Sequence, residues 1–330
     1  MKPLIYIALA CAATLFAGCG ERIVVEPQPI IPLYRGIAAA ADSAAVDSLI
    51  RAERGPLGAL MAYLGADSLT ESAVAAWRES MPMQVFAPAA DSVWPSLGGI
   101  ERDLGSILSR AAADSLDIPR RDYAAVVWGR TKSIVIVDGR EDSTVLIALN
   151  HYLGADYPGY SHWPAYMRLD KDPARLPYDL AEALVADRYP YRPADSRDGG
   201  ATVLSRLVYE GALTLAKIKL VPDGTLAGAL GYTDAQLRWL EENEACIWQA
   251  MVERKMLYDT SESLAERLVA PAPATADISP SSPGRVGRFI GYRILCAYMR
   301  GNARTTLAEM LSPDFYRSPA VLVQAAYEGQ

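Results

Sequence analysis

Apolar residues recur every three or four positions along most of the chain, which is the periodicity of amphipathic helices. This pattern predicts helices within 38–66 and 69–80 and over 98–113. Farther along, it predicts helices at about 178–188, 202–219, 233–256 and 284–301. A short last helix is predicted to begin near Thr305, and the Pro-, Ala- and Ser-rich segment 269–283 is predicted to be a surface excursion.

A period of two, typical of strands, occurs only in the middle of the chain. Short segments rich in β-branched and aromatic residues lie at 123–128, 133–137 and 144–149. Asp138 and Gly139 form a turn signal between the last two segments. The sequence therefore predicts a small mixed sheet at about 123–149, with a hairpin at 138–143. The expected fold class is α+β and predominantly helical.

The N-terminus has the features of a bacterial lipoprotein signal peptide. Lys2 precedes an apolar stretch at about 4–17, and small residues come directly before Cys19. The stretch is too short for a transmembrane helix, which needs roughly 20 residues. We therefore predict that 1–18 is the signal peptide and that Cys19 carries the lipid that holds the mature protein at a membrane. The alternative is an ordinary cleaved signal peptide that happens to contain Cys19.

Residues 19–32 are predicted to form an extended tether, because Pro27, Pro29 and Pro32 disfavour a helix. A single domain over 33–330 follows. No later stretch has the length and apolarity of a membrane span, and no run of acidic residues follows the cysteine. We expect a protein that is lipid-anchored in the cell envelope and faces the periplasm, with the choice of inner or outer membrane left open.

Composition narrows the classes of partner. The formal net charge is −7, and lysines and arginines are not clustered, which argues against a nucleic-acid partner. Four cysteines are present, of which we expect Cys11 to be removed with the signal peptide and Cys19 to be acylated. Cys246 and Cys296 either form a disulfide, which an oxidising compartment permits, or remain buried thiols.

A series of motifs runs through the chain after Tyr123. They lie at 146–154 with Tyr160, Pro164 and Tyr166; at 207–211; at 231–233; at 239–245 with Ile247 and Trp248; and at 282–287 with Gly291 and Tyr298. In this order they resemble the GldB family of gliding-motility-associated lipoproteins of Bacteroidetes, and the segment 239–248 is the most specific. The resemblance implies an envelope lipoprotein linked to gliding motility and to the machinery that exports cell-surface adhesins, with no established chemistry.

The same family is distantly similar to zinc metallopeptidases that have an HExxH helix and a downstream glutamate ligand, which implies a zincin-like domain. In such a helix two histidines one turn apart hold zinc, and the glutamate polarises water. The corresponding residues here are Tyr209, Glu210 and Leu213, so only the glutamate remains. We therefore expect no catalytic residue, no metal and no cofactor.

Two glutamates stand out because each lies among apolar or aromatic residues on a predicted helix: Glu210 and Glu244. With Tyr209 and Leu213 they line a groove left by a degenerate peptidase site, or else they bind Arg206, tyrosines or backbone groups and hold helices together. The leading hypothesis is a non-enzymatic lipoprotein that binds an unidentified envelope protein through this groove.

Two alternatives belong to other functional classes. One is a hydrolase with an unusual metal site built from Glu210, Glu244 and either His151 or His162, which are the only histidines. The other is a glycan- or peptidoglycan-binding protein that uses the aromatic loop after the sheet, including Trp163. Packing of the rings within that loop is the simpler explanation.

The segment 282–287 has two glycines before a predicted helix, with Arg285 and Arg288 nearby. It forms either an anion site at the helix start or a structural turn. Because it follows no predicted strand and lacks the lysine of a phosphate-binding loop, a turn is favoured.

Overall fold

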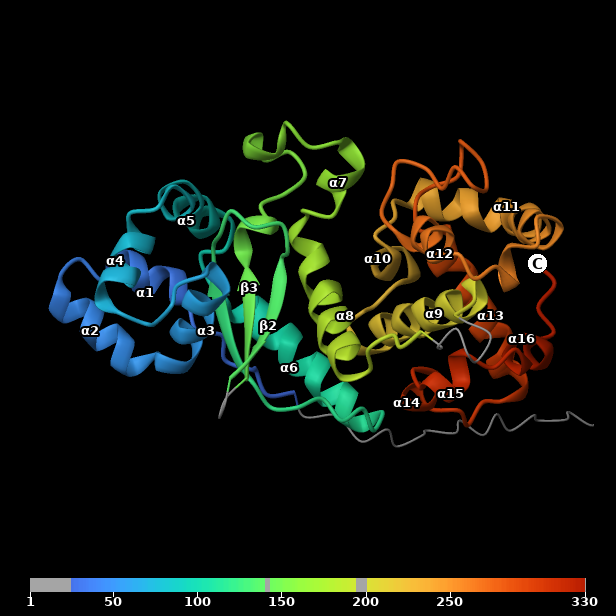
Figure 1. The fold of residues 1–330 in the computed structure, drawn as a ribbon, viewed down its shortest axis with the longest axis horizontal. Coiled ribbons are helices and arrows are strands. Elements are labelled where there is room, and N and C mark those ends of the chain that lie inside the picture. Colours follow the sequence, from blue (N-terminus) through green and yellow to red (C-terminus); the bar gives the residue numbers. More distant parts are fainter. Residues whose placement is uncertain (1–24, 140–142, 194–200, 330) are drawn as a thin grey trace, which may run out of the picture.

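The computed structural model describes residues 25–139, 143–193 and 201–329, whose fold is drawn in Figure 1. The predicted signal peptide, Cys19 and the first part of the predicted tether lie outside these described residues. Within the described part, every helix is too short or too polar to cross a membrane.

The helices that precede the sheet form one end of the molecule, on the left of Figure 1, with α6 reaching under the sheet. They are α1 (Leu33–Ala39), α2 (Ser43–Ala52), α3 (Arg54–Leu64), α4 (Glu71–Arg78), α5 (Met81–Val93) and α6 (Gly98–Ala113). The helix predicted over 98–113 is confirmed. α5 was not predicted, because Pro82 and Pro88 resemble helix breakers. Pro82 lies in the first turn, where an N–H has no intrahelical partner, so only Pro88 disturbs the helix interior.

The sheet consists of β1 (Asp122–Val126), β2 (Ile134–Asp138) and β3 (Ser143–Ala148), in the spatial order β1-β3-β2. β1 runs parallel to β3 and β2 runs antiparallel to it, so the predicted small mixed sheet and the α+β class are confirmed. Asp138 pairs with Ser143, as the predicted hairpin requires. On the outer side of β1, Ile31 forms a parallel bridge with Ala124.

The described end of the predicted tether, 25–32, is attached to the domain. Ile30 is buried in the core, ahead of the first helix. The chain passes so close to α6 that a Cβ on Gly105 would lie 2.1 Å from the carbonyl oxygen of Glu26. Extended backbone, which the prolines favour, therefore becomes part of the domain before Leu33 is reached.

The rest of the chain is helical and forms the centre and the other end of Figure 1. Its elements are η1 (Leu149–His151), η2 (Pro158–Tyr160), α7 (Ala165–Leu169), η3 (Pro173–Arg175), α8 (Leu176–Arg188), α9 (Val203–Leu220), α10 (Leu226–Leu230), α11 (Asp234–Glu253), η5 (Met256–Tyr258), α12 (Glu262–Val269), α13 (Val286–Gly301), α14 (Leu307–Met310), α15 (Pro313–Tyr316) and α16 (Ala320–Ala325).

The four long helices predicted after the sheet are confirmed as α8, α9, α11 and α13. A short helix does begin after Thr306, but it is not the last one, because α15 and α16 follow it. These two helices have four and six residues, too few to show a periodicity in the sequence.

α9 is the central helix of this half, and its most extensive partner is α13. Two glycines allow the helices to touch at their backbones. A Cβ on Gly291 would lie 1.7 Å from the carbonyl oxygen of Leu207, and a Cβ on Gly211 would lie 2.3 Å from the carbonyl carbon of Gly291. Only glycine fits at this crossing. The close approach brings the charged first turn of α13 over α9.

Candidate functional site: a charged cleft beside the sheet

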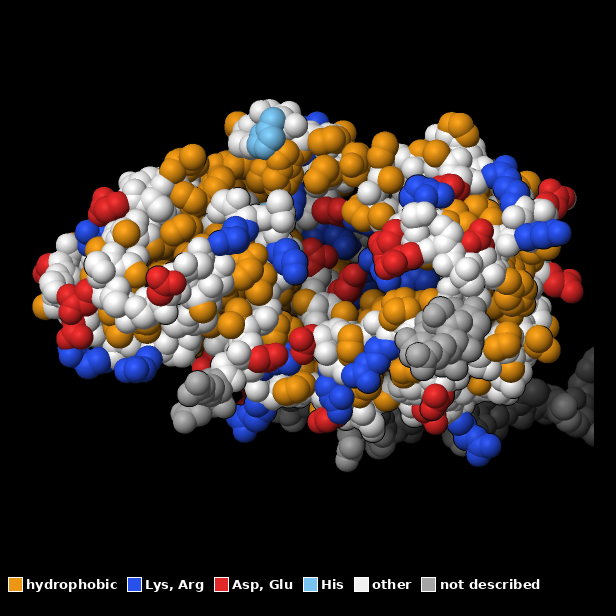
Figure 2. Space-filling model, in the orientation of Figure 1, with side chains coloured by type: hydrophobic (Ala, Val, Ile, Leu, Met, Phe, Trp, Pro, Cys, Tyr) orange, Lys and Arg blue, Asp and Glu red, His pale blue; other side chains and the backbone are white. Residues whose placement is uncertain are grey.

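A cleft of about 460 Å³ opens between the start of β2 and the helices α8, α10 and α13. In Figure 2 it is the hollow at the centre of the molecule, where acidic and basic side chains gather. It is lined by Ser133, Ile134, Asp170, Lys171, Arg175, Asp179, Glu182, Ala183, Ala186, Leu230, Pro271, Arg285 and Arg288. A larger cavity, of about 530 Å³, lies between α6 and β1. We place the candidate site in the smaller cleft because the buried charged groups converge there.

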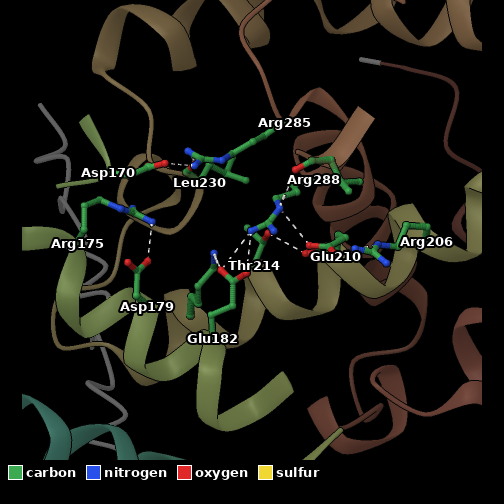
Figure 3. A network of polar contacts seen from close by, with 12 residues as sticks. Asp170, Arg175, Asp179, Glu182, Arg206, Glu210, Thr214, Leu230, Arg285 and Arg288 are labelled. Atoms are coloured by element: carbon green, nitrogen blue, oxygen red, sulfur yellow. Dashed lines mark hydrogen bonds and ion pairs between the residues drawn. The ribbon is translucent and has the colours of Figure 1, made fainter. Parts of the chain in front are cut away.

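Charged residues reach the cleft because three helices carry them at helical spacing. The stripes are Arg175, directly before α8, with Asp179 and Glu182 along α8; Arg206, Glu210, Thr214 and Lys217 along α9; and Arg285 and Arg288 at the start of α13. Residues three or four apart lie on one face of a helix, so the residues of each set share a face. Figure 3 shows the three stripes meeting in one network.

Glu182 lies at the centre of this network. Its Oε1 pairs with Nη1 of Arg288 at 3.0 Å, and its Oε2 accepts a hydrogen bond from Nζ of Lys217 at 2.5 Å. Burial alone would raise the pKa of Glu182, but the charges of Arg288 and Lys217 outweigh it and hold the pKa well below its usual value. Glu182 therefore stays ionised.

Lys217 has a side chain that is only 1% exposed. Its burial lowers its pKa to about 8, although the charge of Glu182 opposes the shift. A buried lysine of this kind stabilises the fold only while it is paired with a carboxylate, here that of Glu182.

Glu210 links α9 to α13. Its Oε1 pairs with Nε of Arg206 at 3.0 Å, and its Oε2 pairs with Nε of Arg288 at 3.1 Å. The carboxylate is 3% exposed. Arg288 thus bridges Glu182 and Glu210, and these two carboxylates raise the pKa of Arg288 against the opposing effect of burial.

Two further ion pairs form the mouth of the cleft. Arg285, whose φ of 66° is left-handed, pairs with Asp170 and donates a hydrogen bond to the carbonyl oxygen of Leu230 at 3.1 Å. Arg175 pairs with Asp179 at 3.3 Å. The hydroxyl of Tyr152 also donates to Asp179 at 2.9 Å. The pKa of Asp179 is raised by burial, although Arg175 opposes the shift.

Lys171 differs from the other cations of the cleft. Its Nζ lies 2.9 Å from Nδ1 of His151, and no described carboxylate lies within ion-pair distance of it. Because an ammonium group only donates, Nδ1 accepts and Nε2 carries the proton that it donates to the carbonyl oxygen of Arg130 at 2.9 Å. Burial, with the charge of Lys171 added, lowers the pKa of His151 to about 4, so its ring is neutral.

The other predicted residues are dispersed. Tyr209 packs its ring against Tyr191 and Tyr316, and Leu213 is buried in the core. Glu244 accepts hydrogen bonds from Arg293 at 2.9 Å and from the hydroxyl of Tyr327 at 2.7 Å.

Glu210 and Glu244 have no ion-pair partner in common, since the first pairs with Arg206 and Arg288 and the second with Arg293. Of the four residues expected to line a remnant groove, only Glu210 thus reaches the edge of the cleft, through Arg288. The contacts of both glutamates hold helices together.

The two histidines lie in different surroundings. His151 is buried, whereas His162 is exposed beside Trp163 in the loop above the sheet. The ring of Trp163 stacks on Tyr160 with centroids 5.2 Å apart, and it also contacts Lys171. Among the described residues, no three His, Cys, Asp or Glu side chains form a group that could hold a metal ion.

Cys246 and Cys296, whose pairing the sequence left open, are both free thiols. Cys246 is exposed and Cys296 is partly buried. They contribute nothing to the cleft.

Five residues of the candidate site were not predicted from the sequence: Asp170, Lys171, Asp179, Glu182 and Lys217. A usable signal was present, because polar residues at four- and three-residue spacing run along α8 and through the otherwise apolar α9. A charged stripe on a helix that is buried on all sides must find partners on a neighbouring element.

Comparison with known proteins gives one result. A family model described as gliding motility protein GldB matches residues 65–329 of the chain. No curated protein and no solved structure matches significantly.

Proposed function

The chain belongs to the GldB family of gliding motility proteins, and we propose that it acts there as a non-enzymatic lipoprotein that binds a polypeptide of the cell envelope in the cleft beside β2. The family is one of lipoproteins, which supports a protein held at a membrane of the envelope. Lipid attachment at Cys19, orientation towards the periplasm and the zincin-like relationship are parts of the same proposal.

The observation that supports a binding role is that the carboxylates in the cleft are paired with cations. Asp170, Asp179 and Glu182 each have a cationic partner, and Glu182 has two. A general base at neutral pH needs a pKa near the working pH, whereas the pKa of Glu182 is held low. The pKa of Asp179 is raised by burial, but its carboxylate already accepts from Tyr152 and pairs with Arg175. A metal ion would have to displace Arg288 and Lys217 to reach this carboxylate. Walls of fixed, paired charges are suited to recognising a ligand.

Cross-linking in living cells tests the proposal. A photoreactive amino acid is placed at Ala186, which lines the cleft, and in a matched variant at Val252, which is 49% exposed on α11 and outside the cleft lining. We expect a covalent adduct of defined mass at Ala186 that is absent at Val252, identified by mass spectrometry. Absence of an adduct at Ala186 and also at Ala183 would count against a ligand in the cleft.

The hydrolase alternative is tested on the purified chain. Its metal content is measured by mass spectrometry, and its activity on a peptide pool is compared with that of Glu182→Gln. We expect no stoichiometric metal and no cleavage. Bound metal, or cleavage that Glu182→Gln abolishes, would overturn the non-enzymatic proposal.

A further inference from the structure

β2 is an edge strand of the described sheet, and its first residue, Ile134, lines the cleft. The other edge of the sheet, on β1, is bridged by Ile31, whereas no described strand pairs with the outer side of β2. Residues 134–137 read Ile-Val-Ile-Val, and all four are partly exposed. Natural proteins blunt such edges with lysine, proline, a bulge or a covering element. Residues 134–137 contain no lysine or proline, and although α8 packs against β2, a cleft separates the two elements at Ser133 and Ile134. This part of the edge can therefore act as a template for another extended chain.

The register shows which backbone groups this edge offers. The N–H of Ala148 donates to the carbonyl oxygen of Ser133 at 2.8 Å, and Ile134 pairs with Ile147. In an antiparallel ladder, the backbone N–H and C=O groups of successive residues alternately face the partner strand and face away from it. The N–H and C=O groups of Ile134 and Ile136 therefore face away from β3. No described residue hydrogen-bonds to these groups.

The cleft gives the occupant of this edge a charge preference. It begins at Ser133 and Ile134, so a chain that pairs with β2 passes directly into it. Arg285, Arg175 and Arg288 already have carboxylate partners there. Lys171 forms no ion pair with a described carboxylate, although the charges of Asp170 and Asp179 act on it. Its ammonium is bound to a neutral histidine ring and lies near Trp163. A carboxylate on the occupant would complete this site.

We infer that an extended segment of a partner polypeptide adds to β2 as a fourth strand, hydrogen-bonded to Ile134 and Ile136, and places a carboxylate beside Lys171. This mode of recognition, in which main-chain hydrogen bonds give affinity and side-chain contacts give specificity, is common in peptide-binding domains. The inference rests on the proposed function, since it names the class of polypeptide and the way in which it binds in the same cleft.

A proline scan of the outer edge tests the added strand. Ile136→Pro removes an N–H that faces away from β3, so the ladder of the sheet is kept. Ile136→Val keeps both the β-branch and the N–H and is the matched control. With the photoreactive residue at Ala186, we expect the adduct to fall about threefold to tenfold in Ile136→Pro, as the loss of one backbone hydrogen bond implies, and to persist in Ile136→Val.

The outcomes separate the two proposals. An adduct that is equally strong in both variants overturns strand addition but leaves a ligand in the cleft. Absence of an adduct in the parent chain counts against the proposed function itself. An adduct with twice the mass of the chain means that a second copy, and not another polypeptide, occupies the edge, and it also overturns the inference.

A measurement on the unaltered edge guards against misfolding of the proline variant. The purified full chain in detergent is used to select from a pool of random 12-residue peptides, and the peptides retained are synthesised with free and amidated carboxyl termini. We expect these peptides to slow amide hydrogen exchange in the segment 133–138. Lys171→Gln should weaken peptides that carry a carboxylate about threefold or more and leave neutral ones unchanged. Retained peptides that leave exchange at 133–138 unaltered, or the absence of any retained peptide, would count against the inference.

Discussion

Gly291→Ala tests the helix crossing on which the cleft depends. The added Cβ would lie 1.7 Å from the carbonyl oxygen of Leu207 and 3.1 Å from the backbone nitrogen of Gly211. Carbon atoms in contact lie about 3.5–4.0 Å apart, so α9 and α13 must separate by roughly 1.5 Å or more. The obstacle is backbone, which cannot rotate away as a side chain can.

The expected cost follows from two opposing effects. Overpacking a core costs about 1–3 kcal/mol, and a clash with backbone belongs at the top of that range or above it. Alanine favours a helix interior over glycine by about 1 kcal/mol, which offsets part of the loss. We expect Gly291→Ala to lower the free energy of unfolding by about 2–4 kcal/mol, measured by urea denaturation followed through tryptophan fluorescence.

A matched substitution and a double-mutant cycle make the prediction specific. A Cβ on Gly99, in the first turn of α6, meets nothing within 4 Å, so Gly99→Ala should be neutral or stabilising by up to about 1 kcal/mol. Gly211→Ala places a Cβ in the same crossing from the α9 side, 2.3 Å from the carbonyl carbon of Gly291. Gly291→Ala already separates the helices, so adding Gly211→Ala should cost little more. The double variant should therefore lose at least about 1 kcal/mol less stability than the sum of the two single losses. Additive losses, or a Gly291→Ala protein as stable as the parent, would refute the crossing.

Three further perturbations address the charges. Lys217→Met leaves Glu182 with Arg288 as its partner and should lower the free energy of unfolding by about 1–3 kcal/mol. The control Lys219→Met, at a 47% exposed lysine, should change it by less than about 0.5 kcal/mol. Equal effects of the two substitutions in urea denaturation would contradict the buried pair. The pKa of His151 in the folded chain, about 4, lies below its ordinary value of 6.5, so the unfolded chain binds a proton more readily. Stability is therefore fully present above pH 6.5 and declines by up to about 3 kcal/mol as the pH falls to 4. His151→Asn should flatten that decline relative to the surface variant His162→Asn, and an unchanged slope would show that His151 is not its source. Tyr327→Phe removes a hydrogen bond to the buried Glu244 and should cost about 1.5–3 kcal/mol in the same assay, while no loss of stability would mean that the C-terminal segment does not hold that carboxylate.

Much of the fold is local in origin and could be predicted from the sequence. The periodicity of 3.6 residues located α6, α8, α11 and α13, because each buries one long face. It also located α9, which is buried on almost every side. The turn signal at Asp138 and Gly139 likewise set the pairing of β2 with β3.

The remaining features depend on contacts between distant segments. The parallel pairing of β1 with β3, past β2, leaves no trace in a pattern of alternation. The sequence allowed a tyrosine partner for Glu244 but could not identify it as Tyr327, which is far from Glu244 in the sequence. The cleft itself required Gly211 and Gly291 to meet, and each glycine alone resembles an ordinary helix glycine.

The charged walls and the apolar edge of the cleft fit a single role. A cleft lined by apolar side chains would tend to close by bringing those side chains together, whereas ionised groups prefer to keep contact with water. Here Glu182 and Glu210 hold α8, α9 and α13 in place through Arg288, so the walls are fixed before any ligand enters. Because the ion pairs are already formed, a ligand has few side chains to order, and binding loses less conformational entropy. The backbone groups of β2 that face away from β3 and the ammonium of Lys171 are then the groups left to make new bonds. Both are suited to an extended polypeptide that carries a carboxylate. The helix crossing thus fixes the walls of the cleft, and the edge of the sheet recognises the ligand.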